Sequence, residues 1–372
     1  MQNRGLRRIL MTADTVGGVW TYALELISGL AQRGVEVALA TMGTSPDRNQ
    51  RKQIAGIRNL SLFESRYKLE WMNDPWEEVD LAGEWLSSLA QCLSPDIVHL
   101  NGYAHGAIEF EVPVLIAGHS CVFSWYKSVK GDIPHEPEWQ LYHSRVRDGL
   151  ARADYIVAPT RSMLESLSLH YGVSFRGKVI SNGRAGEEYV PRIKDPLVLT
   201  AGRLWDEAKN ITALEAIAAR LPWKVYAAGD GLDHAHSDLI HWLGKCSSRV
   251  LAAWMSRASI YALPAKYEPF GLSVLEAGLC GCALVLGDIP SLREIWEDCA
   301  LFVNPDDPDQ LQSTILSFIH QPWLRREYAE RARRRALEFT PDKMGEAYWQ
   351  LYQELLESRK EPLDPTERIL CA

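Results

Sequence analysis

The sequence lacks the long apolar runs and cysteine patterns that define several classes of protein. No stretch of about 18 uninterrupted apolar residues occurs among its 372 residues, so it offers no candidate for a membrane-spanning helix. The seven cysteines are odd in number and irregularly spaced, and no CxxC pair occurs. This argues against a disulfide framework or a zinc site. The first apolar run is too short for a signal peptide, and we expect a cytoplasmic protein with reduced thiols.

Basic residues are outnumbered by acidic ones. The chain carries 40 Lys and Arg against 48 Asp and Glu, a net charge of −8, which argues against a nucleic-acid-binding protein. Residues 1–186 hold 19 basic and 20 acidic side chains, and the rest hold 21 and 28, so local basic sites remain compatible with either half. The basic run 331–335 shares a predicted helix with several glutamates, which favours a solvated, ion-paired face over a membrane or nucleic-acid patch.

The dinucleotide fingerprint GxGxxG is absent, although the chain twice shows the opening of a Rossmann-like domain. A strand, a glycine-containing turn, a helix and a second strand are predicted at 8–13, 14–18, 19–32 and 35–41. The same order is predicted at 196–201, 202–209, 210–220 and 223–228. We therefore predict an α/β protein with two Rossmann-like, doubly wound domains of parallel sheet. A segment rich in Gly, Pro and charge joins them. Without the fingerprint, a nicotinamide-dependent dehydrogenase is disfavoured.

In the second predicted domain, charged residues stand where strands end, which is where such sheets bind ligands. Arg203 and Lys209 share one turn and could hold a diphosphate, or lie on a solvated loop. Glu268 precedes a turn and Glu276 follows in the next helix, and we expect both carboxylates to face one pocket. Carboxylates accept hydrogen bonds from sugar hydroxyls, and free N–H groups at a helix start bind phosphate. The alternative for Glu276 is an acid at the helix start, stabilised by the helix dipole.

The first predicted domain offers a glycine pair and a histidine at strand ends. Gly17 and Gly18 precede a helix, where the backbone could approach a phosphate or simply form a tight turn. His119 follows the strand predicted at 114–117 and could donate to a sugar hydroxyl or phosphate, or be structural. We expect no metal site, because the nearby polar residues lack ligand spacing; these are Asp96, His99, Asn101 and His105.

Taken together, the motifs resemble the retaining GT-B glycosyltransferases of family 4. The matching segments occur in one order over nearly the whole chain: TADTVGGVW, RADYIVAPT, VISNG, AGRLWDEAKN and EPFGLSVLEAGLCGCALVLGD. The resemblance implies two facing domains with a cleft between them. Residues 1–186 would form the acceptor-side domain and 187–341 the nucleotide-sugar donor domain. A C-terminal helix at 342–372 would cross back onto the first domain.

The resemblance also implies roles for individual residues. Arg203, Lys209 and the N–H of Gly18 would hold the donor diphosphate, and Glu276 would accept from the ribose hydroxyls. Glu268 and the 270–273 backbone would bind the transferred sugar, which His119 would contact from the opposite domain. The implied donor-binding residues are Gly17, Gly18, Arg203, Lys209, Phe270, Gly271, Leu272, Ser273 and Glu276, and the catalytic ones are His119 and Glu268.

The expected reaction is metal-independent sugar transfer with retention of anomeric configuration. The donor would be a UDP-sugar in preference to a GDP-sugar, with no further cofactor, and the acceptor a glycan or a lipid-linked sugar. Peripheral contact with the inner membrane face is compatible with this. Arg184 departs from the family pattern, because many relatives carry an apolar residue there. The identity of the donor's nucleobase, uracil or guanine, is left open. A nucleotide-sugar epimerase of the same fold and a non-catalytic nucleotide-sugar-binding protein remain alternatives.

Overall fold

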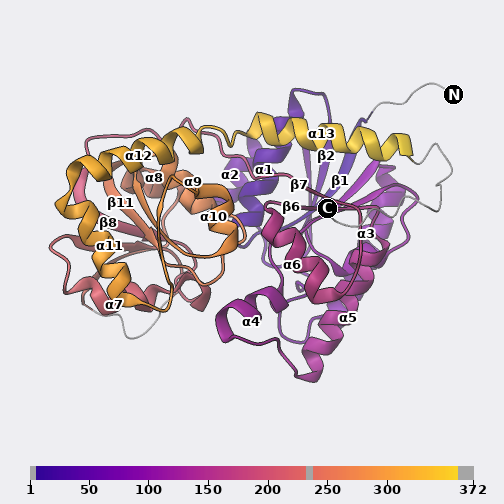
Figure 1. Ribbon diagram of the computed structural model, residues 1–372. Coiled ribbons are helices and arrows are strands. Elements are labelled where there is room, and N and C mark those ends of the chain that lie inside the picture. The colour runs from indigo at the N-terminus through magenta and orange to yellow at the C-terminus, as the bar shows by residue number, and fades with distance from the viewer. Residues whose placement is uncertain (1–5, 232–237, 359–372) are drawn as a thin grey trace. The chain divides into compact units, whose positions relative to one another are not determined.

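The computed structural model describes residues 6–231 and 238–358, which form two compact units. The N-terminal unit comprises residues up to 126, residues 132–183 and residues from 341 onward. The second unit comprises residues 127–131 and 184–340. Figure 1 shows a layer of strands between helices in each unit.

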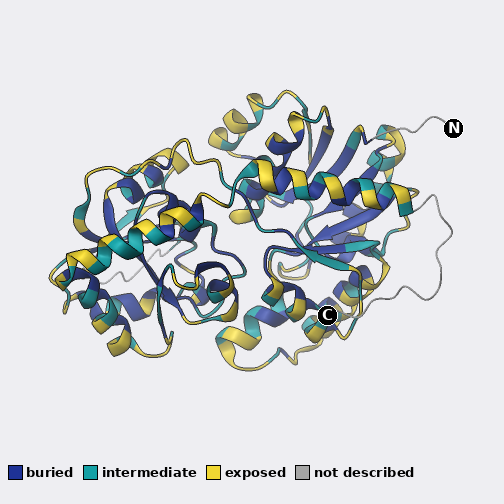
Figure 2. Cartoon of the chain, turned by 45° about the horizontal axis from the view of Figure 1, so that its top comes forward, coloured by how far each residue is buried: buried dark blue, intermediate teal, exposed yellow. Residues whose placement is uncertain are grey.

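The N-terminal unit contains a seven-stranded parallel sheet in the order β3-β2-β1-β4-β5-β6-β7. The strands are β1 (Arg8–Asp14), β2 (Glu36–Met42), β3 (Leu60–Glu64), β4 (Ile97–Leu100), β5 (Val114–Ala117), β6 (Tyr155–Ala158) and β7 (Gly177–Val179). The helices are α1 (Gly18–Ala31), α2 (Arg48–Ala55), α3 (Trp76–Leu93), α4 (Val122–Lys130), α5 (Pro137–Arg152), α6 (Arg161–Tyr171), α13 (Pro341–Ser358) and the 3-10 helix η1 (Ala104–Ala107). Helices cover both faces, so the central strands are apolar on both sides (Figure 2).

The second unit contains a six-stranded parallel sheet in the order β10-β9-β8-β11-β12-β13. The strands are β8 (Asp195–Ala201), β9 (Lys224–Ala228), β10 (Ile240–Gly244), β11 (Ala258–Leu263), β12 (Ala283–Gly287) and β13 (Leu301–Val303). The helices are α7 (Ile211–Ala218), α8 (Ser248–Arg257), α9 (Leu272–Leu279), α10 (Pro290–Trp296), α11 (Pro308–His320), α12 (Pro322–Ala336) and the 3-10 helix η2 (Glu207–Lys209). The prediction of two Rossmann-like α/β domains is confirmed.

The C-terminal helix α13 packs against α1 in the N-terminal unit. Met344, Tyr348 and Leu355 share a buried cluster with residues of α1 and β1. The two helix backbones touch at Gly29, where a Cβ would lie 2.8 Å from the carbonyl oxygen of Pro341. This close approach explains the glycine in the middle of α1. The end of the predicted 342–372 helix, residues 359–372, lies outside the described residues.

Two strands, β3 and β10, were not predicted from the sequence. Both are edge strands, and only one residue in the two of them is fully buried. Their sequences therefore lack the apolar runs that mark the central strands.

The basic run 331–335 lies in α12 and is ion-paired as predicted. Arg331 pairs with Glu327 within the helix, and Arg335 pairs with Glu338 just beyond its end. Within the described ranges, no helix is both long and apolar enough to cross a membrane.

Candidate functional site

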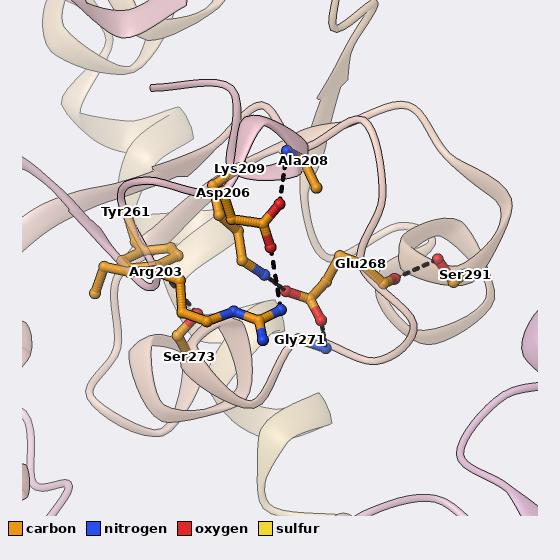
Figure 3. Close-up of polar contacts among 10 residues, drawn as sticks. Arg203, Asp206, Ala208, Lys209, Tyr261, Glu268, Gly271, Ser273 and Ser291 are labelled. Atoms are coloured by element: carbon orange, nitrogen blue, oxygen red, sulfur yellow. Dashed lines mark hydrogen bonds and ion pairs between the residues drawn. The ribbon is translucent and has the colours of Figure 1, made fainter. Parts of the chain in front are cut away.

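In the second unit, the loops that follow β8 and β11 meet through a lysine–glutamate pair. The two strands are parallel neighbours, so their carboxyl ends lie at the same edge of the sheet. Lys209 ends η2 in the first loop, and its Nζ lies 2.5 Å from Oε2 of Glu268 in the second loop. Each side chain is only 13% exposed. The structure therefore brings together two of the predicted site residues as a largely desolvated ion pair (Figure 3).

Glu268 is also tied to the start of α9. Its Oε1 accepts a hydrogen bond of 3.0 Å from the N–H of Gly271, and its carbonyl oxygen accepts one of 2.6 Å from Ser291 Oγ (Figure 3). Gly271 is the N-cap of α9 with φ of 88°, and a Cβ there would lie 3.0 Å from Val274 Cγ2. Glycine is therefore required at this turn. The N–H groups of the first helical turn point out of the helix, where they can bind an anion.

Arg203 is tied within its own loop. Its Nη2 donates to Oδ2 of Asp206 at 3.0 Å, and its guanidinium lies 5.5 Å from the ring centre of Trp205. Asp206 also accepts from the N–H of Ala208 and so caps η2. The aspartate thus orients the arginine within the loop that carries Lys209.

The side chains of the predicted segment 270–273 are buried or partly buried and contact other residues of the same unit. Phe270 is buried and packs edge-to-face on Phe339 at 5.8 Å between ring centres. Ser273 Oγ accepts a hydrogen bond of 2.8 Å from the hydroxyl of Tyr261, and burial raises the pKa of that tyrosine. Leu272 is the first residue of α9 and is partly buried. The segment therefore has its backbone N–H groups to offer a ligand.

Glu276 lies one turn further along α9 and is bound to different partners. Its Oε1 accepts from Arg184 Nε and from Tyr189 Oη, both at 2.8 Å. We expected the carboxylates of Glu276 and Glu268 to face one pocket. The structure shows them bound to different cations, Glu276 to Arg184 and Glu268 to Lys209. The alternative of an acid at the helix start is wrong, because Glu276 is the fifth residue of α9 and the first turn holds no acidic residue.

In the N-terminal unit, the glycine pair opens α1. Gly17 is the N-cap with φ of 75°, and both glycines are exposed. Asp14 shapes this turn by accepting from the N–H of Val16 at 2.7 Å. No side chain caps α1, so the first N–H groups of this helix have no side-chain acceptor at the N-cap.

His119 follows β5, and its tautomer is set by Asn101, which follows β4. Asn101 Nδ2 donates to the carbonyl oxygen of Thr12 at 2.6 Å, so Oδ1 is the acceptor that lies 2.7 Å from His119 Nε2. Nε2 therefore carries the proton and Nδ1 the lone pair. Burial lowers the pKa of His119 to about 4, so the ring is neutral at pH 7. In this tautomer the N–H of the neutral ring is used by Asn101, and Nδ1 is the atom that His119 can offer a ligand, as an acceptor.

Two family models cover most of the chain. Glycosyltransferase Family 4 matches residues 16–184, and Glycosyl transferases group 1 matches residues 188–335. The chain belongs to the family 4, group 1 glycosyltransferases. A D-inositol 3-phosphate glycosyltransferase of Xylanimonas cellulosilytica is 24% identical over 396 residues, covering 92% of this chain and 93% of that protein. A glycogen synthase of Mycobacterium tuberculosis is 26% identical over 379 residues, covering 88% and 90%.

Solved glycosyltransferase structures share the fold. Sucrose-phosphate synthase from Thermosynechococcus elongatus has a TM-score of 0.79 at 19% identity, covering 95% of this chain and 100% of that chain. Anabaena HepE in complex with UDP-glucose has a TM-score of 0.73 at 17% identity, covering 94% and 99%. This glycosyltransferase therefore has the GT-B fold, built from two Rossmann-like domains.

Sequence reasoning missed an aromatic network beside His119 in this glycosyltransferase. The ring of Tyr22 meets His119 edge-on at 4.4 Å between centres, and its hydroxyl lies 3.3 Å from His99 Nε2. His99 Nδ1 lies 2.6 Å from the hydroxyl of Tyr352 in α13. His99 is fully buried, and burial lowers its pKa to about 3. The nearest signal in the sequence was the expectation that a C-terminal helix crosses back onto the first domain, which does not show that Tyr352 would contact a residue 253 positions away.

The polar group around His99 has no metal-like arrangement. His99 contacts tyrosine hydroxyls, and His105 Nε2 lies 2.9 Å from the carbonyl oxygen of Val79. Asp96 accepts from the backbone N–H groups of Arg7 and Arg8. In the part of the chain that the structure describes, no group of three or more His, Cys, Asp or Glu side chains is placed to hold a metal ion.

Proposed function

We propose that this glycosyltransferase transfers a sugar from a UDP-sugar to a glycan or a lipid-linked acceptor, with retention of anomeric configuration and without a metal ion. The observation that carries the proposal is the Lys209–Glu268 pair, held against the start of α9 by the N–H of Gly271. It sets a cation, a carboxylate and free helix N–H groups at one sheet edge. A nucleoside diphosphate sugar needs these three kinds of contact.

Cations and helix N–H groups would bind the diphosphate. The Lys209 ammonium has three N–H donors, and its contact with Glu268 uses one of them. Arg203 adds a planar fork of donors from the same loop, and the first turn of α9 adds backbone N–H groups. Cleavage of the anomeric bond increases the negative charge on the diphosphate. Donors that are already oriented stabilise that charge without reorganisation, which supports transfer without a metal.

Carboxylate and imidazole acceptors would bind hydroxyls of the donor. Glu268 would accept from the transferred sugar and Glu276 from the ribose. In the N-terminal unit, the N–H of Gly18 would donate to the diphosphate, with Gly17 giving the backbone its turn. His119 would accept a sugar hydroxyl at Nδ1.

The transfer would proceed on one face of the sugar. The bond between the anomeric carbon and the diphosphate oxygen breaks, and the acceptor oxygen bonds to the same carbon from the same side. The acceptor proton passes to the departing phosphate oxygen, so no protein base or covalent nucleophile is needed. The engagement of Glu268 with Lys209 and the N–H of Gly271 supports this assignment.

The names of similar proteins favour a uridine donor and a hydroxylated acceptor. Anabaena HepE binds UDP-glucose. Two curated relatives are named for a phosphorylated inositol and for glycogen, and both names are compatible with a hydroxylated acceptor.

A donor screen followed by product analysis tests the proposal. Thermal shifts with UDP-, GDP- and ADP-sugars should be largest for a UDP-sugar. Transfer to an acceptor should then give a product with the donor's anomeric configuration by NMR, with a rate unchanged by EDTA. An inverted product would refute retention, and loss of activity in EDTA would refute metal independence. Isomerised donor without transfer would indicate an epimerase, and donor binding with no turnover a non-catalytic binding protein.

A further inference from the structure

Arg184 connects the start of the second unit to the carboxylate of Glu276. Its backbone N–H donates to the carbonyl oxygen of Phe339 at 3.0 Å, which anchors the residue within this unit. Its guanidinium lies 5.0 Å from the ring centre of Tyr189, and its side chain is 14% exposed. The arginine is therefore held in place at both its backbone and its side chain.

The three side chains form a closed triangle of hydrogen bonds. Arg184 Nε donates to Glu276 Oε1 at 2.8 Å, and Arg184 Nη2 donates to Tyr189 Oη at 2.6 Å. Tyr189 Oη in turn donates to Glu276 Oε1 at 2.8 Å. All these bonds to the carboxylate end on one oxygen, Oε1, whose two lone pairs they use. Oε2 then remains as the acceptor that Glu276, 10% exposed, can offer to a ligand.

We propose that Arg184 is a positioning residue of the donor site, which fixes the Glu276 carboxylate through Oε1 so that Oε2 accepts from the vicinal hydroxyls of the donor ribose. This inference rests on the proposed function. In this arrangement, recognition of the two ribose hydroxyls depends on the hydrogen-bonded triangle of Arg184, Tyr189 and Glu276.

The geometry explains why arginine suits this position. Its planar fork reaches two acceptors at once, the carboxylate and the tyrosine hydroxyl, whereas a lysine ammonium is a point charge on a flexible stem. Without the guanidinium, Glu276 would keep the hydroxyl of Tyr189 and could rotate about its side-chain bonds. The carboxylate would then be less well oriented when the ribose arrives, and donor binding would weaken.

Calorimetric titration with UDP and 2′,3′-dideoxy-UDP tests the proposal. Arg184→Leu should weaken binding of UDP about 10-fold, the effect of losing one charge-assisted contact. The same substitution should change binding of dideoxy-UDP by less than about 2-fold, because that ligand has no hydroxyls for Glu276 to accept from. Arg184→Lys should restore part of the UDP affinity. Tyr189→Phe retains the arginine and should cost about 3-fold.

Arg220→Leu is the matched control. Arg220 pairs with Asp309 at 2.9 Å on the surface of the same unit. Arg220 follows α7, which runs from the loop after β8 back to the amino ends of the strands, away from the proposed site. Arg220→Leu should therefore not change UDP binding. Thermal unfolding of each variant identifies any that fail to fold, in which case Tyr189→Phe and Arg184→Lys carry the test.

Two results would overturn the inference. Equal penalties with UDP and dideoxy-UDP, or none with either, would show that Arg184 does not act through the ribose, and would leave the proposed function standing. Failure of the unmodified protein to bind UDP, GDP or ADP would instead refute the proposed function, and this inference with it.

Discussion

Replacing the Lys209–Glu268 pair one residue at a time, and then together, separates its effect on stability from its effect on the donor. Lys209→Met keeps the length of the side chain and removes the cation, whereas Glu268→Gln keeps the shape and removes the anion. Each single change leaves one charge that is only 13% exposed without its counter-ion. The double change removes both charges.

The burial of the pair sets the size of the expected effects. Breaking a buried ion pair costs about 3–5 kcal/mol, because the remaining charge is desolvated and uncompensated. The Gly271 N–H still supports Glu268, and both groups keep some solvent contact, so we expect about 2–3 kcal/mol for each single variant. The double variant should lose only about 1–2 kcal/mol, which gives a coupling energy of about 3 kcal/mol.

Donor binding should follow a different pattern. Lys209→Met should weaken UDP binding about 10-fold or more, since one charge-assisted contact is worth ~1.5–3 kcal/mol. The double variant should regain stability and stay weak in UDP binding, because the cation is still missing. Restored UDP binding in the double variant would show that Lys209 serves the donor only by compensating the charge of Glu268.

Local stability is best read from hydrogen exchange of peptides that span β11 and α9, and affinity from calorimetry with UDP. The more exposed pair of Lys266 and Asp306 in the same unit is the control, and its coupling should stay below about 1 kcal/mol. Additive effects of Lys209→Met and Glu268→Gln on stability would refute the ion pair as described.

Two further predictions concern the turn before α9 and the buried histidines. Gly271→Ala should lower the free energy of unfolding by about 1–3 kcal/mol, because φ is 88° and the new Cβ would meet Val274, and it should also weaken UDP binding. Gly186→Ala is the control, because its Cβ would have no contact nearer than 3.8 Å, and it should change neither the thermal melt nor the UDP titration. Burial lowers the pKa of His99 to about 3 and of His119 to about 4, so the folded state binds fewer protons than the unfolded state below pH 6.5. The two neutral histidines therefore favour the folded state fully above pH 6.5, and at pH 5 each should lower the free energy of unfolding by about 2 kcal/mol. Hydrogen exchange of β4 at pH 7 and pH 5 measures this loss, and His99→Gln should make it smaller. Equal protection of β4 at pH 7 and pH 5 would contradict the prediction.

Much of the fold could be predicted because buried parallel strands carry their own signal. Central strands such as β5 and β12 are continuous apolar runs, and glycine-containing turns and amphipathic helices follow several of them. The positions of Lys209 and Glu268 followed from the same rule, since residues after neighbouring parallel strands end at one edge. The edge strands β3 and β10 could not be predicted, because partial exposure removes the apolar run.

The partners of the site residues could not be predicted, because they come from distant parts of the chain. Arg184 and Glu276 are 92 positions apart, and His99 and Tyr352 are 253 apart. A motif shows which side chains face a strand end. It does not show which oxygen of a carboxylate is already used, or which nitrogen of an imidazole carries the proton. The acceptor role proposed for His119 depends on the amide orientation of Asn101, which is in turn set by the carbonyl oxygen of Thr12 in β1.

Net charge gave no guide to the proposed diphosphate site because its cations are already paired. Lys209 is bound to Glu268, Arg203 to Asp206 and Arg184 to Glu276, so each cation brings its own anion to the site. A diphosphate must therefore bind beside three carboxylates. Its affinity would come from the donors that these pairs do not use. These include the remaining N–H groups of Lys209 and Arg203 and the unpaired N–H groups at the start of α9. The paired carboxylates would in turn accept the sugar and ribose hydroxyls. At the proposed site, pairing would thus let one set of residues serve both the phosphate and the hydroxyl parts of the donor, and this would explain how a donor site can lie in the more acidic half of the chain.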